Sequence, residues 1–145
     1  MRSAPLALVA LVVALPTLAH EAGTGEPGKT AQAKRAVVVE MGDDMRFRPA
    51  LARAKKGETL RIVADNRGKL AHELVLGTRE ELEEHAAMMR EHPGMRHDEP
   101  NAVRVAPGAK GEIVWRFTQA GEVPFACLEP GHFEAGMAGK VVVEP

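Results

Sequence analysis

The chain has 145 residues, of which 45% are hydrophobic, 27% are charged and only 3% are aromatic. This length suits one domain, and the low aromatic content predicts a core built mainly from aliphatic side chains. The formal net charge of −1 at pH 7 provides no basic excess for a phosphate backbone, so we do not expect nucleic acid as a partner.

Residues 1–19 have the organisation of an export signal. Arg2 gives a positively charged start, an apolar run of about 12 residues begins at Ala4, and Ala19 offers a small residue at the cleavage position. Because a membrane-spanning helix needs about 20 apolar residues, we predict a cleaved signal peptide, export to the periplasm and no membrane span. Cleavage there would make His20 the first residue. Its amine and imidazole could then chelate Cu(II), although a disordered end is the more common outcome.

Residues 20–35 combine Gly, Ala, Thr and charged residues without helical or strand periodicity, and we expect a flexible segment there. A domain over residues 36–145 follows, in which short β-like runs alternate with turn residues such as Asn, Gly and Pro. This pattern indicates an all-β sandwich or barrel. The expected strands cover residues 37–39, 45–49, 59–64, 72–76, 102–105, 112–117, 123–127 and 140–143.

One segment of the domain interrupts the β pattern. Thr78 and Glu81 form a capping box, and the acidic residues of the first turn lie where the helix dipole favours them. The helical spacing of apolar residues continues until Pro93-Gly94 ends it. We therefore predict a short helical insert at about residues 79–92, between two strands.

Cys127 is the only cysteine of the chain. Cysteines of exported proteins normally occur in pairs because their compartment is oxidising, and a single cysteine cannot form an intramolecular disulfide. Two interpretations are open for such a residue, a buried unreactive thiol and a thiolate that a metal ion protects. The residues that follow Cys127 favour the second interpretation.

Cys127, His132 and Met137 form a C-x4-H-x4-M pattern. A thiolate, an imidazole and a thioether suit copper rather than Mg²⁺ or Ca²⁺, and we expect Pro130-Gly131 to turn the chain so that these side chains face one point. His72 opens an expected strand and is the candidate second imidazole of a His₂Cys copper site with a weak axial Met. An isolated histidine at a strand edge is more often simply solvated, so His72 depends on the other three residues for its support.

With these residues in place, the chain resembles the cupredoxins, the blue-copper family, over roughly residues 36–143. The likeness rests on four segments: residues 45–49 (MRFRP), the turn at 56–59 (KGET), Asn66 with residues 72–77 (HELVLG), and the ligand loop at 127–137. The resemblance implies a Greek-key β-sandwich that binds one type 1 copper ion.

The resemblance also implies the role of each ligand. His72, Cys127 and His132 would be equatorial ligands, and Met137 would be the axial ligand. The chain carries Glu73 where several azurin-like members carry Asn. A carboxylate at this place is expected to alter the hydrogen bonding near the cysteine sulfur.

Further methionines and histidines lie in and after the expected helix. Methionine at helical spacing usually packs into a core, and this interpretation is open above all for Met89. Clustered thioethers and imidazoles at an exported surface also suit Cu(I), so a second, weaker copper site is the alternative hypothesis. The residues concerned are His85, Met88, Met89, His92, Met95 and His97.

Two functions fit this site. The chain is similar to cupredoxins associated with copper resistance, and its His- and Met-rich insert favours periplasmic copper tolerance with a redox-active Cu(I)/Cu(II) ion. The alternative is a small diffusible electron carrier of a respiratory or photosynthetic chain. Electrons would then pass through His132 to a redox partner that docks on an apolar patch of Leu128, Pro130, Phe133 and Ala135.

Two other classes of function receive less support. A structural β-sandwich without metal would leave the ligand pattern unexplained. No nucleophile–base pattern, phosphate-binding loop or pair of carboxylates stands out, and an axial methionine leaves copper no open position for a substrate. We therefore expect a monomeric binding protein and not an enzyme.

Overall fold

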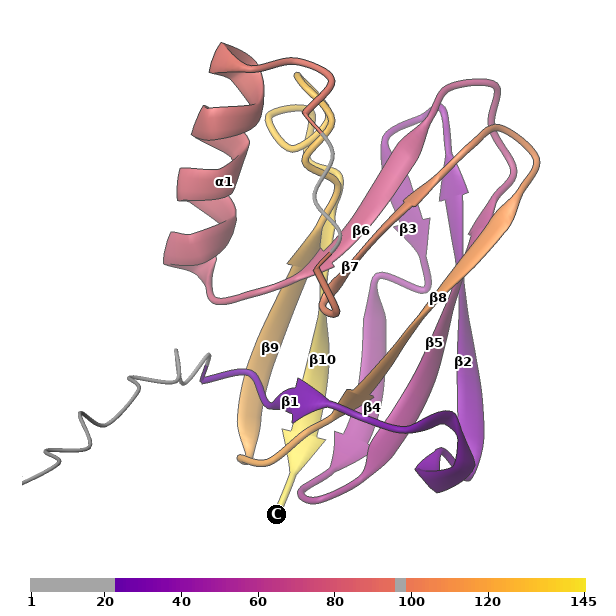
Figure 1. Cartoon of the computed structure of the whole chain (residues 1–145), viewed down its shortest axis with the longest axis vertical. Helices are drawn as coiled ribbons and strands as arrows, with labels where there is room; N and C mark the ends of the chain where they lie inside the picture. The colour runs from indigo at the N-terminus through magenta and orange to yellow at the C-terminus, as the bar shows by residue number, and fades with distance from the viewer. Residues whose placement is uncertain (1–22, 96–98) are drawn as a thin grey trace, which may run out of the picture.

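The computed structural model describes residues 23–95 and 99–145. In these ranges two five-stranded sheets pack face to face, and one α-helix lies outside them (Figure 1). The predicted signal peptide, His20 and His97 lie outside the described residues.

The first sheet contains, in spatial order, β1 (Glu26–Pro27), β8 (Lys110–Arg116), β5 (Thr59–Asn66), β2 (Arg35–Gly42) and β3 (Arg46–Arg48). The second contains β4 (Leu51–Lys55), β10 (Ala138–Glu144), β9 (Gly121–Ala126), β6 (His72–Leu76) and β7 (Ala102–Val105).

The chain passes repeatedly between the two sheets, which gives each sheet a mixed pairing pattern. β2 pairs with β5 and β4 pairs with β10 in parallel, whereas the other strand pairs are antiparallel. Strands that follow one another in the chain therefore lie in different sheets at several points, as in the expected Greek-key sandwich. The all-β fold class with one short helix is confirmed.

Strand β6 is covered on both faces. Most strands alternate between buried and exposed residues, but all five residues of β6 are buried. Leu74 and Leu76 belong to the core between the sheets, whereas Val75 packs in a second cluster beneath the helix. His72 is the first residue of this strand, which packs against the core between the sheets on one face and against the helix cluster on the other.

Helix α1 (Arg79–Glu91) forms where the capping box predicts it. The Thr78 hydroxyl accepts a hydrogen bond from the Glu81 amide at 3.2 Å, and the Glu81 carboxylate accepts one from the Thr78 amide at 2.7 Å. The helix buries one face against the second sheet and the ligand loop. This cluster contains Leu82, Ala86 and Met89 of the helix with Val75, Ala126 and Leu128.

The described part of residues 20–35 differs from the flexible segment that we expect. It contains β1, which pairs with β8, and a 3₁₀ helix (Thr30–Gln32). The Gly28 amide donates to the Val114 carbonyl at 2.9 Å, and the Trp115 indole donates to the Thr24 carbonyl at 3.1 Å. A two-residue strand carries no sequence periodicity, which explains why the sequence pattern does not reveal it.

Strand β4 is also absent from the predictions. Its buried positions are occupied by Ala52 and Ala54, and alanine is depleted in strands, so the run does not read as β-like. Among the described residues, no helix is long and apolar enough to cross a membrane.

Candidate metal centre

The predicted ligands come from two neighbouring strands of the second sheet. His72 begins β6, and Cys127 directly follows the last residue of β9. β6 and β9 are antiparallel neighbours with Val75 opposite Ala126, so the continuation of β9 brings Cys127 back towards the start of β6. His132 and Met137 lie on the loop that joins β9 to β10.

Three donor atoms converge at this end of the sheet. Cys127 Sγ lies 3.9 Å from His72 Nδ1 and 3.3 Å from His132 Nδ1. The two imidazole rings have centroids 5.0 Å apart. Among the histidine, cysteine and acidic residues that the structure describes, only His72, Cys127 and His132 form a group whose ligand atoms all lie within 4.8 Å of one another.

This spacing fits one metal ion. Protein metal sites have bonds of about 2.3 Å to a thiolate and about 2.0 Å to an imidazole, so a trigonal arrangement separates sulfur and nitrogen by about 3.8 Å. The distance to His72 in the structure, 3.9 Å, lies close to this value, and the distance to His132, 3.3 Å, is somewhat shorter. One thiolate and two imidazoles are also the donor set of a His₂Cys copper site.

Burial controls the protonation of the donors. Cys127 is completely buried, and this burial raises the pKa of its thiol to about 12. The backbone amide of Glu73 donates to Cys127 Sγ at 3.3 Å. Burial, followed by the proximity of His72, lowers the pKa of His132. At neutral pH the metal-free site thus holds a thiol beside a neutral His132 imidazole, the form in which an imidazole binds a metal.

Met137 is placed by the backbone of the ligand loop. The Cys127 amide donates to the Met137 carbonyl at 3.1 Å, and the Met137 amide donates to the His132 carbonyl at 3.1 Å. The Met137 side chain is fully buried and belongs to the same core cluster as Cys127. The loop is therefore closed at its base with the methionine turned inward, and the axial role of Met137 stays a prediction.

Glu73 donates a hydrogen bond to the cysteine sulfur through its backbone amide. Any residue at position 73 would supply this amide, and the carboxylate makes no hydrogen bond to the sulfur among the described residues, so the expected change in hydrogen bonding is not observed. The carboxylate is buried, and its Oε2 has no hydrogen-bond partner among the described residues. Burial, followed by the proximity of Glu129, raises the pKa of Glu73 to about 7.

Helix α1 anchors the ligand loop, and this corrects the predicted docking patch. Leu128 is only 1% exposed and packs in the cluster that contains Met89. Phe133 is half-buried against the same cluster. An ion pair between Arg90 and Glu134 joins the helix to the loop a second time. Leu128 is therefore unavailable to a partner, because the helix covers it.

The methionines and histidines of the helical insert divide into two groups. Met89 is buried in the helix cluster, which confirms the packing interpretation for this residue. Met88 and Met95 are 37% and 42% exposed, and His92 is also exposed. We call Met88, His92 and Met95 the exposed Met–His cluster; its role in Cu(I) binding stays a prediction.

Asp43 contacts the site without any signal in the sequence. Its Oδ1 lies 3.3 Å from His72 Nε2, on the side of the ring that faces away from Cys127. The two residues are separated by 29 positions: Asp43 lies in the turn between β2 and β3 of the first sheet, whereas His72 begins β6 of the second. No local motif marks such a contact, so only the folded structure reveals it.

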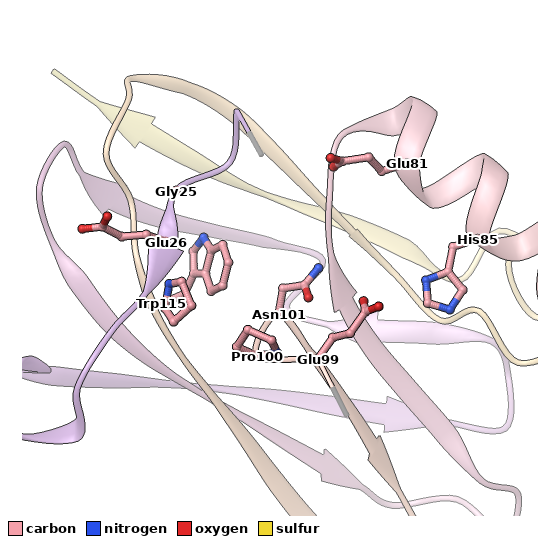
Figure 2. Close-up of a pocket in the computed structure, with 9 residues that line it drawn as sticks. Gly25, Glu26, Glu81, His85, Glu99, Pro100, Asn101 and Trp115 are labelled. Atoms are coloured by element: carbon pink, nitrogen blue, oxygen red, sulfur yellow. The ribbon is translucent and has the colours of Figure 1, made fainter. Parts of the chain in front are cut away.

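A hollow lies between the helix and the N-terminal strand, apart from the three donor residues. It has a volume of about 460 Å³, and Figure 2 shows Glu81 and His85 of α1 on one side of it and Trp115 with Glu26 on the other. The Glu81 carboxylate is already engaged in the capping box. None of the residues that line this hollow belongs to the donor group of the metal centre.

Sequence comparisons connect this chain with copper proteins. The profile of the family described as "Copper binding proteins, plastocyanin/azurin family" matches residues 33–144. A "Copper-resistant cuproprotein CopI" of Rubrivivax gelatinosus is 59% identical over 127 residues, which cover 86% of this chain and 77% of the relative. A protein of the same description from Pseudomonas aeruginosa is 38% identical over 156 aligned positions, covering 88% of this chain and 86% of the relative.

Solved structures support the fold. Auracyanin B matches with a TM-score of 0.68 at 20% sequence identity, covering 84% of this chain and 97% of that structure. Reduced auracyanin from Roseiflexus castenholzii matches with a TM-score of 0.67 at 19% identity, covering 78% of this chain and 99% of that structure. At these identities the likeness establishes the shared sandwich fold.

Proposed function

Because this chain belongs to the plastocyanin/azurin family of copper-binding proteins, we propose that it binds one copper ion at the metal centre and serves copper tolerance. The observation that carries this proposal is the convergence of His72, Cys127 and His132 in a chain whose relatives are described as copper-resistant cuproproteins. The donor set suits copper, and the relatives supply the physiological role.

In this proposal His72, Cys127 and His132 would hold the ion, and Met137 would supply a fourth, weaker ligand. Bound copper supplies a one-electron couple between Cu(I) and Cu(II). The protein itself gathers the donors: β6 fixes His72, and the closed loop fixes the other three residues. Because His72, Cys127 and Met137 are completely buried and His132 is only partly exposed, solvent reaches the site mainly along the edge of His132.

Three further features belong to the proposal. The protein acts by binding copper rather than by catalysis, because three donors and a buried methionine leave little room for a substrate. The apolar start of the chain directs it to the periplasm, where a tolerance protein meets incoming copper. It works as a monomer, and any redox partner docks near His132. Pro130 and Ala135 are the exposed apolar residues beside His132.

Copper-dependent growth tests the function. We expect deletion of the gene in its host to impair growth in medium with added copper and to leave growth in ordinary medium unchanged. The wild-type gene should restore copper-resistant growth, whereas a Cys127→Ser variant expressed at the same level should not.

The same experiment separates tolerance from electron transport. A growth defect in ordinary medium, under conditions that require respiration or photosynthesis, would instead support the electron carrier. Full copper resistance with the Cys127→Ser variant would contradict the proposal, because tolerance would then not depend on the metal centre.

A further inference from the structure

The imidazole of His72 is held from two opposite sides. Its Nδ1 faces Cys127 Sγ at 3.9 Å, and its Nε2 faces Asp43 Oδ1 at 3.3 Å. A neutral imidazole carries one proton, and an ionised carboxylate can only accept a hydrogen bond. The proton therefore belongs on Nε2, which leaves the Nδ1 lone pair directed towards the thiol and the metal position.

Asp43 is itself held in place by the loop that precedes β6. Its Oδ2 accepts a hydrogen bond from the Lys69 amide at 2.7 Å, and its Oδ1 accepts one from the Leu70 amide at 3.1 Å. Gly68 lies so close that an added Cβ would be 2.0 Å from Asp43 Oδ1. Glycine at position 68 therefore lets the carboxylate approach both the loop and the ring of His72.

Asn66 supports the same loop from its other side. Its Nδ2 donates to the Leu70 carbonyl at 2.8 Å and to the Val105 carbonyl at 3.0 Å, and its Oδ1 accepts from the Gly68 amide at 2.9 Å. The loop between β5 and β6 is thus tied to β7 by Asn66 and to the β2–β3 turn by Asp43. The carboxylate beside His72 sits in a fixed frame.

We propose that Asp43 is a positioning residue for the copper ligand His72, which directs Nδ1 at the metal and strengthens His72 as a donor to Cu(II). This inference rests on the ligand set of the proposed function. A carboxylate that accepts the N–H of a ligating histidine fixes the tautomer of the ring and raises its basicity. The stronger donor favours the more highly charged Cu(II) ion over Cu(I).

The expected size of the effect follows from such carboxylate–histidine pairs. Loss of the partner typically lowers metal affinity by about 10- to 100-fold. We expect Asp43→Asn to lower the Cu(II) affinity within this range and to lower the Cu(I) affinity less. Each tenfold fall in the Cu(II) affinity relative to the Cu(I) affinity raises the reduction potential by about 59 mV.

Asp44 provides a matched control in the same turn. Its carboxylate pairs with Arg48 at the surface, and in the described part of the chain it forms no hydrogen bond or ion pair with the four ligands. Asp44→Asn removes the same charge from the same turn, so it separates the loss of the carboxylate beside His72 from a general loss of negative charge. We expect its Cu(II) affinity and reduction potential to stay close to those of the wild type.

The experiment combines two measurements on the full mature protein. Competition with a chelator of known affinity gives the Cu(II) and Cu(I) affinities of the wild type, Asp43→Asn and Asp44→Asn, and a redox titration gives their potentials. Nitrogen-15 NMR of the metal-free wild type, at a pH where His72 is neutral, gives its tautomer without any substitution. We expect the Nε2–H tautomer, with Nδ1 unprotonated.

The outcomes separate this inference from the proposed function. A weaker Cu(II) affinity and a higher potential in Asp43→Asn alone would support it, whereas values equal to those of Asp44→Asn would overturn it. An Nδ1–H tautomer in the wild type would also overturn it, even where the Asp43→Asn protein fails to fold. A wild-type protein that binds no copper would defeat the proposed function, and the tautomer would still show whether Asp43 orients the ring.

Discussion

The two ends of the sandwich are stabilised by different interactions. At the metal end, His72, Cys127 and Leu128 are at most 1% exposed, and the surface ion pair between Arg90 and Glu134 only supplements this buried packing. At the opposite end, where the C-terminus lies (Figure 1), surface ion pairs close the structure. Arg35 binds Glu58 at 2.7 Å, and Arg53 binds Glu144 at 3.1 Å.

This difference indicates where the stability of the protein resides. An exposed ion pair contributes about 0 to 1 kcal/mol, whereas the loss of a buried leucine side chain costs about 2 to 5 kcal/mol. The metal centre is therefore built on buried packing rather than added to the surface. Substitutions of its buried residues should affect both folding and copper binding, and substitutions of the surface ion pairs at the opposite end should affect neither strongly.

Leu128→Ala should have the largest effect on folding. The substitution removes the side chain through which the ligand loop packs on helix α1, and we expect a loss of about 3 kcal/mol in the free energy of unfolding. Urea unfolding of the metal-free protein measures this value. Leu51→Ala is the control, because Leu51 is 44% exposed and should change stability by less than about 0.5 kcal/mol. Equal losses in the two variants would contradict the conclusion that buried packing contributes more to stability than surface contacts do.

The two histidines should differ in their contribution to the metal-free fold. His72→Ala removes a fully buried ring and its contact with the Asp43 carboxylate, so we expect a loss of about 2 kcal/mol. His132 is partly exposed on the loop, and His132→Ala should cost less than about 1 kcal/mol. Denaturant unfolding of both variants without copper tests this order, and the reverse order would show that the loop, not the strand, stabilises the site.

Glu58→Gln tests the opposite end through its pH dependence. Burial acts to raise the pKa of Glu58, but hydrogen bonds from Arg35 and the Lys55 amide outweigh it and hold the pKa below its usual value of 4.5. The ionised carboxylate thus stabilises the fold above about pH 4.5, and this contribution is lost as the pH falls through the lowered pKa.

We expect Glu58→Gln to cost about 1 kcal/mol at pH 7 and nearly nothing at pH 3. Urea unfolding at both pH values measures the difference. Glu144→Gln is the matched control, since its partner Arg53 is more exposed than Arg35. A Glu58→Gln penalty that is equally large at pH 3 would mean that the charge of the carboxylate does not stabilise the fold.

The exposed Met–His cluster should show the smallest effect, confined to weak Cu(I) binding. In a Cys127→Ala protein, whose metal centre is disabled, we expect residual Cu(I) binding that disappears when Met88 and Met95 are replaced by leucine. Met89→Leu is the control, because Met89 is buried. Titration with Cu(I) under anaerobic conditions decides the question. No residual binding in the Cys127→Ala protein, or binding that survives the double replacement, would refute the second site.

Local sequence patterns predict the elements that carry the ligands. β6 and β7 have the predicted bounds, and helix α1 begins at its capping box. The C-x4-H-x4-M spacing indicates the ligand loop because Cys127, His132 and Met137 lie within one short connection. In each case the signal and the structure involve residues that are close in the chain.

The parts that the sequence does not predict depend on contacts between distant residues. β4 becomes a strand by parallel pairing with β10, although its alanines do not favour one. Leu128 is buried because helix α1 folds over it, and Asp43 meets His72 across 29 positions. Local sequence patterns carry no information about contacts between residues that are far apart in the chain. They therefore predict the ligands but not the distant residues that support them.

The visible spectrum of the copper-loaded protein tests the central claim most directly. The mature protein, purified and loaded with Cu(II), should show intense thiolate-to-copper absorption in the visible region because Cys127 is a ligand. The Cys127→Ser variant, loaded in the same way, should lack this absorption. A colourless Cu(II) complex of the wild type, or an unchanged spectrum in Cys127→Ser, would contradict the assignment of the metal centre.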